Sequence, residues 1–379
     1  MRILYVASDQ LVPGNTGGSV HVLEVARGLA ARGHEVHAVI GQAGGASDRE
    51  RWEGVEWHRI RWAPRHRFFR FRARHQVGAL ADALRPHAVM ERYYNFGGEG
   101  VLAAAERGLP ALLEVNSPVL DHPGSLKAAL DGLLLVRPFR RHRERLCREA
   151  SALVSPLLEI VPAFARPKTV TVTWGANVDA FRPEERSQAV RRSLGIPDGA
   201  VAVLFSGSFR PWHGVHVLEA AARQLAHRED LFFVLAGGPA SGPAAGYRGV
   251  RLGAIAYQRM PEVVAAADIG VAPYDTTRLA QLRLGFFWSP LKVFETMASG
   301  LPTVTIARHP LTEIVREGEE GLHFQEGDPA SLASVLVRLA EAPALRQRLG
   351  QNARRRVVAH YSWANHCAAL EDVLKRIAP

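Results

Sequence analysis

The chain has 379 residues, 47% of them hydrophobic, which is more than one core usually holds and enough for two domains of ordinary size. Its 47 Lys and Arg residues outnumber 37 Asp and Glu residues, and the net charge of +10 favours anionic partners without distinguishing phosphate ligands, membranes and nucleic acids. Cys147 and Cys367 are the only cysteines, which supports neither a disulfide framework nor a cysteine metal site and predicts a reducing, cytoplasmic setting.

The N-terminus enters a strand-like pattern at once, without the basic segment, apolar core and small-residue cleavage site of a signal peptide. No apolar run reaches the roughly 20 residues that a membrane-spanning helix needs. Any membrane contact is therefore expected to be peripheral, at the inner face of the membrane.

Short apolar runs alternate with helical patterns along the first half. A strand, a helix and a strand in this order indicate a parallel sheet covered by helices on both faces. The predicted elements are a strand over 3–7, a helix over 20–32, and strands over 36–40, 89–91 and 112–115.

The second half begins the alternation again, so we predict an α/β protein with two facing, doubly wound parallel sheets. Turn residues between Thr173 and Asp198 mark the hinge. Such folds bind ligands beyond the C-terminal ends of their strands, which places the expected site in the cleft between the domains. The predicted elements of the second half are strands over 201–206, 231–236 and 268–272 and a helix over 215–226. The predicted domains are 1–178 and 179–360, followed by a last helix within 361–379 that could pack back on the first domain.

A glycine-rich loop over 13–19 lies between the first strand and the first helix. Gly17 and Gly18 would let backbone N–H groups approach a phosphate, although the spacing matches neither the dinucleotide G-x-G-x-x-G motif nor a P-loop. Two interpretations stay open: ligand contact, or a plain loop in which Ser19 caps the helix.

The corresponding loop of the second half, over 207–214, combines a cationic and a titratable side chain. Arg210 can bind a diphosphate through two parallel charge-assisted hydrogen bonds, and His213 can add a further donor. The alternative is a surface ion pair for Arg210 and a packing role for Trp212. The position after a strand favours ligand binding.

Residues 289–304 combine a polar turn, a helix and a strand around one carboxylate. Backbone N–H groups of the first helical turn would be free at the positive end of the helix dipole, where they could hold an anion. Glu295, just over one turn into the helix, could accept hydrogen bonds from a pair of sugar hydroxyls. The candidate donor-binding residues of this segment are Pro290, Leu291, Lys292 and Glu295.

Two of the charged residues have competing interpretations. Lys292 lies three residues before Glu295, so these two could form an ordinary surface pair instead of a ligand site. Glu313 follows a turn, where a solvated carboxylate at a helix start competes with a donor-binding one.

Two basic stretches lie over 58–74 and 137–148, and the first interleaves Arg with aromatic residues. Such stretches lie on anionic bilayers or bind nucleic acid. Neither carries an RNA- or DNA-binding motif, so no nucleic-acid partner is expected. Peripheral contact with an anionic membrane competes here with a plain solvated surface.

Short motifs spread over nearly the whole chain carry a family resemblance. They are Gly17-Gly18, Gly33-His34-Glu35-Val36, 177–183, 236–239, 267–273, 289–304, Glu313-Ile314-Val315 with Gly321-Leu322, and Tyr361-Ser362-Trp363. In this order and spacing they resemble the retaining nucleotide-sugar glycosyltransferases of the GT-B fold, in the family 4-like group with sucrose synthase and the bacterial phosphatidylinositol mannosyltransferases. The resemblance implies two facing Rossmann-like domains, an acceptor side followed by a donor side.

The resemblance also implies roles for individual residues. Glu295 matches the second of two family glutamates and would hold the ribose hydroxyls, but Phe287 stands where the first glutamate, which helps place the donor sugar, is expected. Ser208 and His213 stand where the family has an Arg and a Lys. Arg210 could replace the missing Arg and, with His213, stabilise the departing diphosphate in catalysis.

The implied reaction is transfer of a hexosyl group from a nucleoside diphosphate sugar to a hydroxyl of a glycan, lipid or small molecule, with retention and without an obligatory metal or other cofactor. The diphosphate would help to take up the acceptor proton. Asn116 and Glu114 occupy the region of a family histidine and are the expected active-site residues of the first domain. Two other functions stay open: a nucleotide-sugar 2-epimerase of the same fold, and a catalytically weak subunit that binds donor or lipid.

Overall fold

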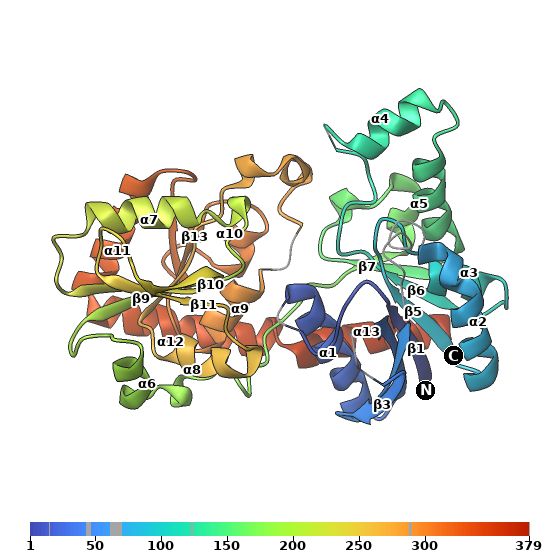
Figure 1. The fold of residues 1–379 in the computed structure, drawn as a ribbon, viewed down its shortest axis with the longest axis horizontal. Helices are drawn as coiled ribbons and strands as arrows, with labels where there is room; N and C mark the ends of the chain where they lie inside the picture. Colours follow the sequence, from blue (N-terminus) through green and yellow to red (C-terminus); the bar gives the residue numbers. More distant parts are fainter. Residues whose placement is uncertain (15, 43–46, 61–69, 123, 288–289, 379) are drawn as a thin grey trace. The chain divides into compact units, whose positions relative to one another are not determined.

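The computed structural model describes residues 1–14, 16–42, 47–60, 70–122, 124–287 and 290–378. The chain forms two compact units, each built around one sheet with helices packed on it (Figure 1). Unit 1 comprises Met1–Trp174, Phe287–Ser289 and Trp363–Pro379, and unit 2 comprises Gly175–Phe286 and Pro290–Ser362.

Unit 1 contains an eight-stranded sheet in the order β3-β4-β2-β1-β5-β6-β7-β8. Neighbouring strands are parallel except β3, which pairs antiparallel with β4. The strands are β1 (Arg2–Ala7), β2 (Glu35–Gly41), β3 (Arg49–Trp52), β4 (Val55–Ile60), β5 (Ala88–Arg92), β6 (Ala111–Glu114), β7 (Ala152–Ser155) and β8 (Thr169–Thr171).

The last helix of the chain, α13, belongs to unit 1 and packs against α1, β6 and β7. Its Glu371 pairs with Arg32, at 2.7 Å from Nε, and lies 3.2 Å from Nε2 of His34. The helices of unit 1 are α1 (Gly17–Ala31), α2 (Arg74–Leu84), α3 (Glu99–Ala105), α4 (Leu126–Leu133), α5 (Pro138–Glu149) and α13 (Trp363–Ile377).

Unit 2 contains a six-stranded sheet in the order β11-β10-β9-β12-β13-β14, whose neighbouring strands pair parallel, with register shifts between β10 and β11 from Gly237 to Pro243. The strands are β9 (Val201–Ser206), β10 (Leu231–Pro243), β11 (Gly249–Gly253), β12 (Ile269–Ala272), β13 (Thr303–Ile306) and β14 (Gly321–Phe324). The helices are α6 (Gln188–Ser193), α7 (Val215–Gln224), α8 (Met260–Ala265), α9 (Leu291–Ala298), α10 (Leu311–Ile314), α11 (Pro329–Glu341) and α12 (Pro343–His360).

The predicted architecture of two parallel, helix-covered sheets is confirmed. Each strand predicted above is present, because its apolar residues fill the centre of a sheet: all residues of β9, for example, are buried. The order places the β9, β10 and β12 ends side by side, since β9 lies between the other two. No helix in the described part of the chain is long and apolar enough to cross a membrane.

Candidate active site

The glycine-rich loop of unit 1 leads directly into α1, which begins at Gly17. Thr16 caps this helix, since its hydroxyl oxygen accepts a hydrogen bond from the Ser19 N–H at 3.2 Å. Ser19 was expected to be the cap if the loop were plain, and the structure moves the cap three residues earlier. Gly17 and Gly18 are therefore the first helical residues, whose N–H groups have no partner within the helix.

The loop after β9, over 207–214, is built by close backbone approaches that only glycine permits. A Cβ added at Gly214, where φ is +69°, would collide with the carbonyl oxygen of Pro273. One added at Gly237, at φ +101°, would collide with the carbonyl oxygen of Gly207. The loop is thus pressed against Gly237 within β10 and against Pro273, the residue that follows β12.

Two side-chain nitrogens converge on Gly207. A Cβ at this glycine would lie 2.8 Å from Nζ of Lys292 and 3.1 Å from Nδ1 of His213. Both nitrogens are buried, and neither has a hydrogen-bond partner among the described residues. We call Gly207, His213 and Lys292 the Gly207 group. Buried, unsatisfied nitrogens beside a bare glycine backbone form an arrangement suited to an anion.

Aromatic rings hold the Lys292 ammonium in place. Its Nζ lies 4.3 Å from the ring centre of Phe205 and 5.2 Å from that of Tyr274. Such cation–π contacts stabilise an ammonium that has left water. The expected alternative for Lys292, a surface pair with Glu295, is wrong, because its Nζ is buried against these rings.

The environment shifts the titration of both side chains. Burial lowers the pKa of Lys292 to about 7, although the negative charge of Glu295 acts to raise it. Burial also lowers the pKa of His213 to about 2, and the charges of Lys292 and Arg210 add to this. His213 is therefore neutral at physiological pH, and Lys292 titrates close to physiological pH.

Helix α9 carries the predicted carboxylate. Pro290 is its N-cap, and the carbonyl of Pro290 accepts from the N–H groups of Val293 at 2.8 Å and Phe294 at 3.2 Å. The N–H groups of Leu291 and Lys292 remain at the open helix end. Glu295 is buried, and its charge adds to burial in raising the pKa of Tyr274.

The other predicted residues of unit 2 lie in more open positions. Ser208 and Arg210 are exposed on the loop after β9. Glu313, on α10, has a side chain that is 67% exposed, and its Oε1 lies 3.1 Å from Nδ1 of His309. The observed setting of Glu313 favours the solvated alternative.

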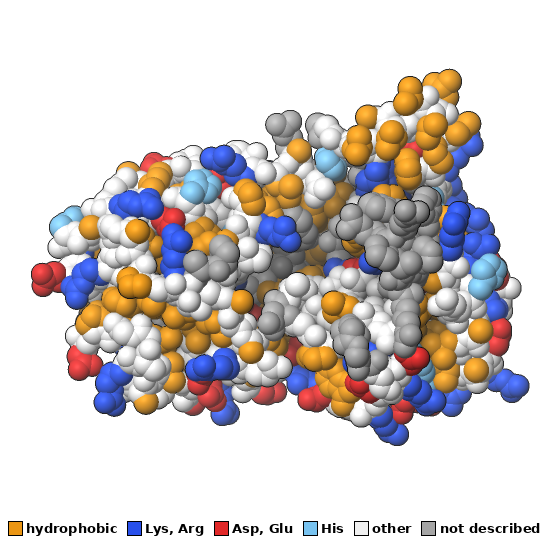
Figure 2. Space-filling view, in the orientation of Figure 1, with side chains coloured by type: hydrophobic (Ala, Val, Ile, Leu, Met, Phe, Trp, Pro, Cys, Tyr) orange, Lys and Arg blue, Asp and Glu red, His pale blue; other side chains and the backbone are white. Residues whose placement is uncertain are grey.

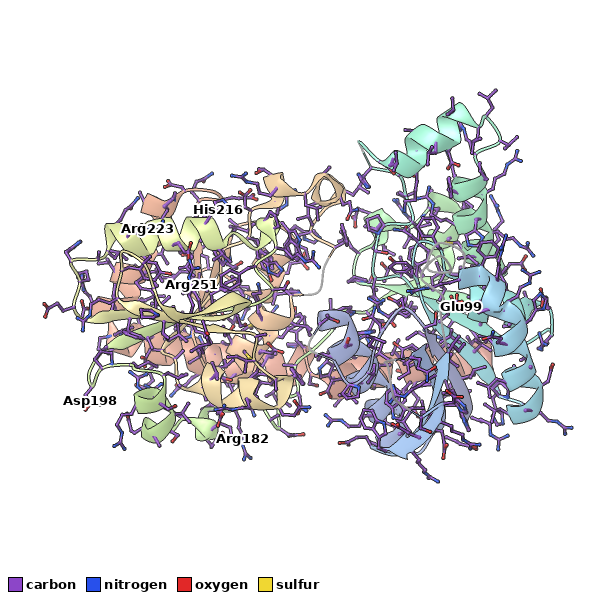
Figure 3. The ribbon with its side chains drawn as sticks, viewed as in Figure 1. Glu99, Arg182, Asp198, His216, Arg223 and Arg251 are labelled. Carbon is purple, nitrogen blue, oxygen red and sulfur yellow. The ribbon has the colours of Figure 1, made fainter. Side chains whose placement is uncertain are left out.

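Further residues, absent from the predicted site, flank the Gly207 group. Phe205, Tyr274 and Asp275 come from the end of β9 and the residues after β12. His216, in the first turn of α7 (Figure 3), has its Nε2 3.2 Å from Oδ2 of Asp275. Aromatic and acidic residues directly after a parallel strand were the signal that could have identified them.

In unit 1, Glu114 ends β6 and is buried with two histidines. Its Oε1 lies 2.6 Å from Nε2 of His21 on α1 and 3.8 Å from Nε2 of His366 on α13, and its Oε2 accepts from the Tyr5 hydroxyl at 3.2 Å. Burial alone would raise the pKa of Glu114, but the histidines and Arg92 lower it to about 2. The carboxylate is therefore ionised and already partnered.

His21, Glu114 and His366 place three metal-capable ligand atoms within 4.8 Å of one another. Nε2 of His21 and Oε1 of Glu114 lie 2.6 Å apart, and neither atom makes a hydrogen bond of regular geometry within the described residues. Nδ1 of His366 lies 2.8 Å from the Thr173 carbonyl oxygen, and burial lowers the pKa of His366 to about 4. The neutral ring thus donates from Nδ1.

Asn116 lies two residues beyond β6 and is also buried. Its Oδ1 accepts a hydrogen bond from Nε1 of Trp174 at 2.9 Å, whereas its Nδ2 has no partner among the described residues. A buried amide that still has donors to offer is suited to a hydroxyl of a ligand.

Part of the predicted regions lies outside the described residues. These parts are residues 61–69 of the first basic stretch, Asn15 of the glycine-rich loop, and Ser289 at the start of 289–304.

Comparison with known proteins gives two family matches. Residues 16–166 match the model of the glycosyl transferase 4-like domain, and residues 200–342 match that of the glycosyl transferases group 1. The D-inositol 3-phosphate glycosyltransferases of Streptomyces avermitilis and Thermomonospora curvata are each 27% identical, over 75% and 92% of this chain. The alignments span 64% and 88% of those relatives.

Solved structures share the fold at low sequence identity. Sucrose-phosphate synthase from Thermosynechococcus elongatus has a TM-score of 0.74 at 19% identity, covering 99% of this chain and 98% of its own. HepE from Anabaena, in complex with UDP-glucose, has a TM-score of 0.71 at 15% identity, covering 99% and 100%. The two domain matches, in this order on two parallel-sheet units, show that the chain is a glycosyltransferase with the GT-B fold.

Proposed function

We propose that the enzyme is a retaining glycosyltransferase that moves a hexosyl group from a nucleoside diphosphate sugar to an acceptor hydroxyl. The observation that carries this proposal is the Gly207 group, in which the buried nitrogens of Lys292 and His213 face a glycine backbone without partners of their own. HepE binds UDP-glucose and has the same fold. A diphosphate in unit 2 would satisfy both nitrogens.

The donor would extend from the Gly207 group along α9. Its diphosphate would contact Lys292 and the N–H groups at the start of the helix, and the ribose hydroxyls would bind Glu295 one turn further on. Lys292 supplies the charge that the family pattern carries at 208 and 213, because its ammonium lies beside His213. Exposed Arg210 would close onto the diphosphate from solvent. A further donor contact is proposed for Ser208.

The chemical problem is the negative charge that develops on the departing diphosphate. A well-placed donor in such a position typically contributes about 3–4 kcal/mol to the transition state. The released diphosphate would take up the acceptor proton on the face of the sugar that it leaves, so the configuration is retained and no protein base is needed. No metal is required in this scheme, because Lys292, Arg210 and the helix end supply positive charge.

In unit 1, Asn116 is proposed to hold a hydroxyl through its unpartnered Nδ2. Glu114 would act through His21, because its carboxylate already contacts that ring and the Tyr5 hydroxyl. Unit 1 would thus serve the acceptor, which the proposal leaves as a glycan, lipid or small molecule.

The test is acceptor-dependent release of nucleotide. The purified enzyme is screened by thermal shift against nucleoside diphosphate sugars, beginning with UDP-glucose, and the best donor is incubated with and without saccharide, inositol phosphate and lipid acceptors. We expect nucleotide release that needs an acceptor and persists in EDTA. An epimerised donor without an acceptor would identify an epimerase, and binding without turnover would identify a binding subunit; either result contradicts the proposal.

Proton uptake on binding gives a pH-dependent prediction. Lys292 in the free enzyme loses its proton as pH rises through about 7, below its ordinary value of 10.5, whereas a bound diphosphate would stabilise the ammonium and raise this pKa again. UDP affinity should therefore fall from pH 7 to 9. Calorimetry at pH 8 in two buffers of different ionisation enthalpy should show uptake of a proton, and Lys292→Met should abolish it. Equal proton uptake by the variant would disprove the assignment.

A further inference from the structure

Helix α4 buries its polar side and exposes its apolar side. Asp131 is its only buried residue. A helix on the surface of a globular protein ordinarily has the opposite pattern, with its apolar stripe packed against the core. The exposed apolar side chains, which continue into the turn after the helix, are Leu126 (73% exposed), Leu130 (37%), Leu133 (78%), Leu134 (50%), Leu135 (84%) and Val136 (55%). We call these six residues the apolar ridge.

The packing of Asp131 fixes this inverted orientation. Its Oδ1 accepts from the N–H of Phe139 at 2.9 Å, and its Oδ2 accepts from the N–H of Arg140 at 2.8 Å. Asp131 therefore satisfies the first turn of α5, where two N–H groups have no partner within the helix. Because the carboxylate is held inward, the leucines on the other side of α4 face solvent. Figure 1 shows α4 standing out from the sheet of unit 1.

Positive charge lies next to the apolar ridge. The second basic stretch, over 137–148, lies on α5 and the residue before it. Figure 2 shows hydrophobic side chains gathered over α4 with Lys or Arg side chains beside them. Glu144 pairs with Arg140 and Arg148, and Glu149 pairs with Arg145. The exposed arginines are Arg137, Arg140, Arg141, Arg145 and Arg148.

We propose that the apolar ridge inserts into the interface of an anionic bilayer while the arginines of α5 contact lipid headgroups. Leucines that face outward beside a row of cations are the combination that interfacial membrane segments use. A second copy of the chain fits less well. A two-fold dimer through this patch would bring the same arginines toward each other, and an eight-residue helix is short for the roughly 800 Å² per partner of a stable interface.

Sedimentation of the full chain with vesicles tests this proposal. Vesicles of phosphatidylcholine with about a third phosphatidylglycerol are compared with pure phosphatidylcholine at low and high salt. We expect binding to the anionic vesicles, weakened by salt, and at least a tenfold loss of binding for the double variant Leu133→Glu, Leu135→Glu. Arg137→Gln with Arg141→Gln should weaken binding to anionic vesicles only. Val358→Glu, an equivalent change at an exposed apolar residue of α12, is the control and should bind as the original chain does.

Several outcomes would overturn the proposal. They are a chain that stays in the supernatant with anionic vesicles, equal binding of the Leu133→Glu, Leu135→Glu variant, and a dimer in solution that this variant converts to monomers. Circular dichroism checks that the variants fold, which is expected because the replaced side chains are exposed. The vesicle result is independent of glycosyl transfer, since it needs neither donor nor acceptor.

Discussion

Replacing Lys292 with methionine is expected to lower kcat/KM for glycosyl transfer by about 10²- to 10³-fold, the usual cost of removing one preorganised donor to a developing anion. Methionine keeps the length and apolar body of the side chain, so the contacts with Phe205 and Tyr274 are retained while the charge beside Gly207 is lost. The measurement is acceptor-dependent nucleotide release under kcat/KM conditions with the donor found by thermal shift.

The design of this experiment separates catalysis from folding. Lys375→Met removes an exposed ammonium that pairs with Glu371 on α13, and it should leave kcat/KM unchanged. Without bound ligand, the Lys292→Met variant should be at least as stable as the original chain. The substitution removes the cost of burying an ammonium that has no hydrogen-bond partner among the described residues. An unchanged kcat/KM for Lys292→Met would remove Lys292 from the proposed mechanism.

The location of Glu295 could be predicted because its signals are local. Proline before the helix and glycine after it marked both ends of α9, and the apolar run after them is β13 over Thr303–Ile306. The same reasoning predicted both parallel sheets, since strand, helix and strand alternate within short stretches. One difference is that β10 continues to Pro243, beyond the predicted end at 236, with register shifts against β11 between Gly237 and Pro243.

The surroundings of Lys292 could not be predicted in this way. Phe205 and Tyr274 are 69 residues apart in the sequence. They meet around the Lys292 ammonium only because β12 pairs with β9. No local pattern encodes that strand order. His21 and His366 meet at Glu114 for a related reason, since α13 returns to pack on α1 and β6.

Helix α4 shows the opposite difficulty. Leu126, Leu130 and Leu133 recur at helical spacing, which ordinarily predicts a buried face. The structure places them in solvent because Asp131 on the other side is needed to cap α5. Periodicity identifies an apolar face but does not say what covers it. Here the side of α4 that packs inward carries Asp131, which caps α5, and the apolar side faces solvent.

Glu295→Ala is expected to weaken binding of the nucleoside diphosphate by about 10- to 100-fold. A hydrogen bond to a charged group contributes about 1.5–3 kcal/mol, and 1.4 kcal/mol corresponds to a factor of ten in affinity. Glu295 is buried on α9, so water cannot easily replace the lost acceptor. Calorimetry with UDP measures the change, and Glu319→Ala, which removes an exposed carboxylate of unit 2, is the matched control.

A sharper form of this experiment compares UDP with its 2′-deoxy analogue. If Glu295 holds the ribose hydroxyls, the original enzyme should bind the deoxy analogue more weakly than UDP, and Glu295→Ala should bind both almost equally. The two changes then remove the same interaction and their effects are not additive. Additive losses would show that Glu295 acts on another part of the nucleotide, and equal binding of both ligands by the original enzyme would rule out a ribose contact at the 2′ position.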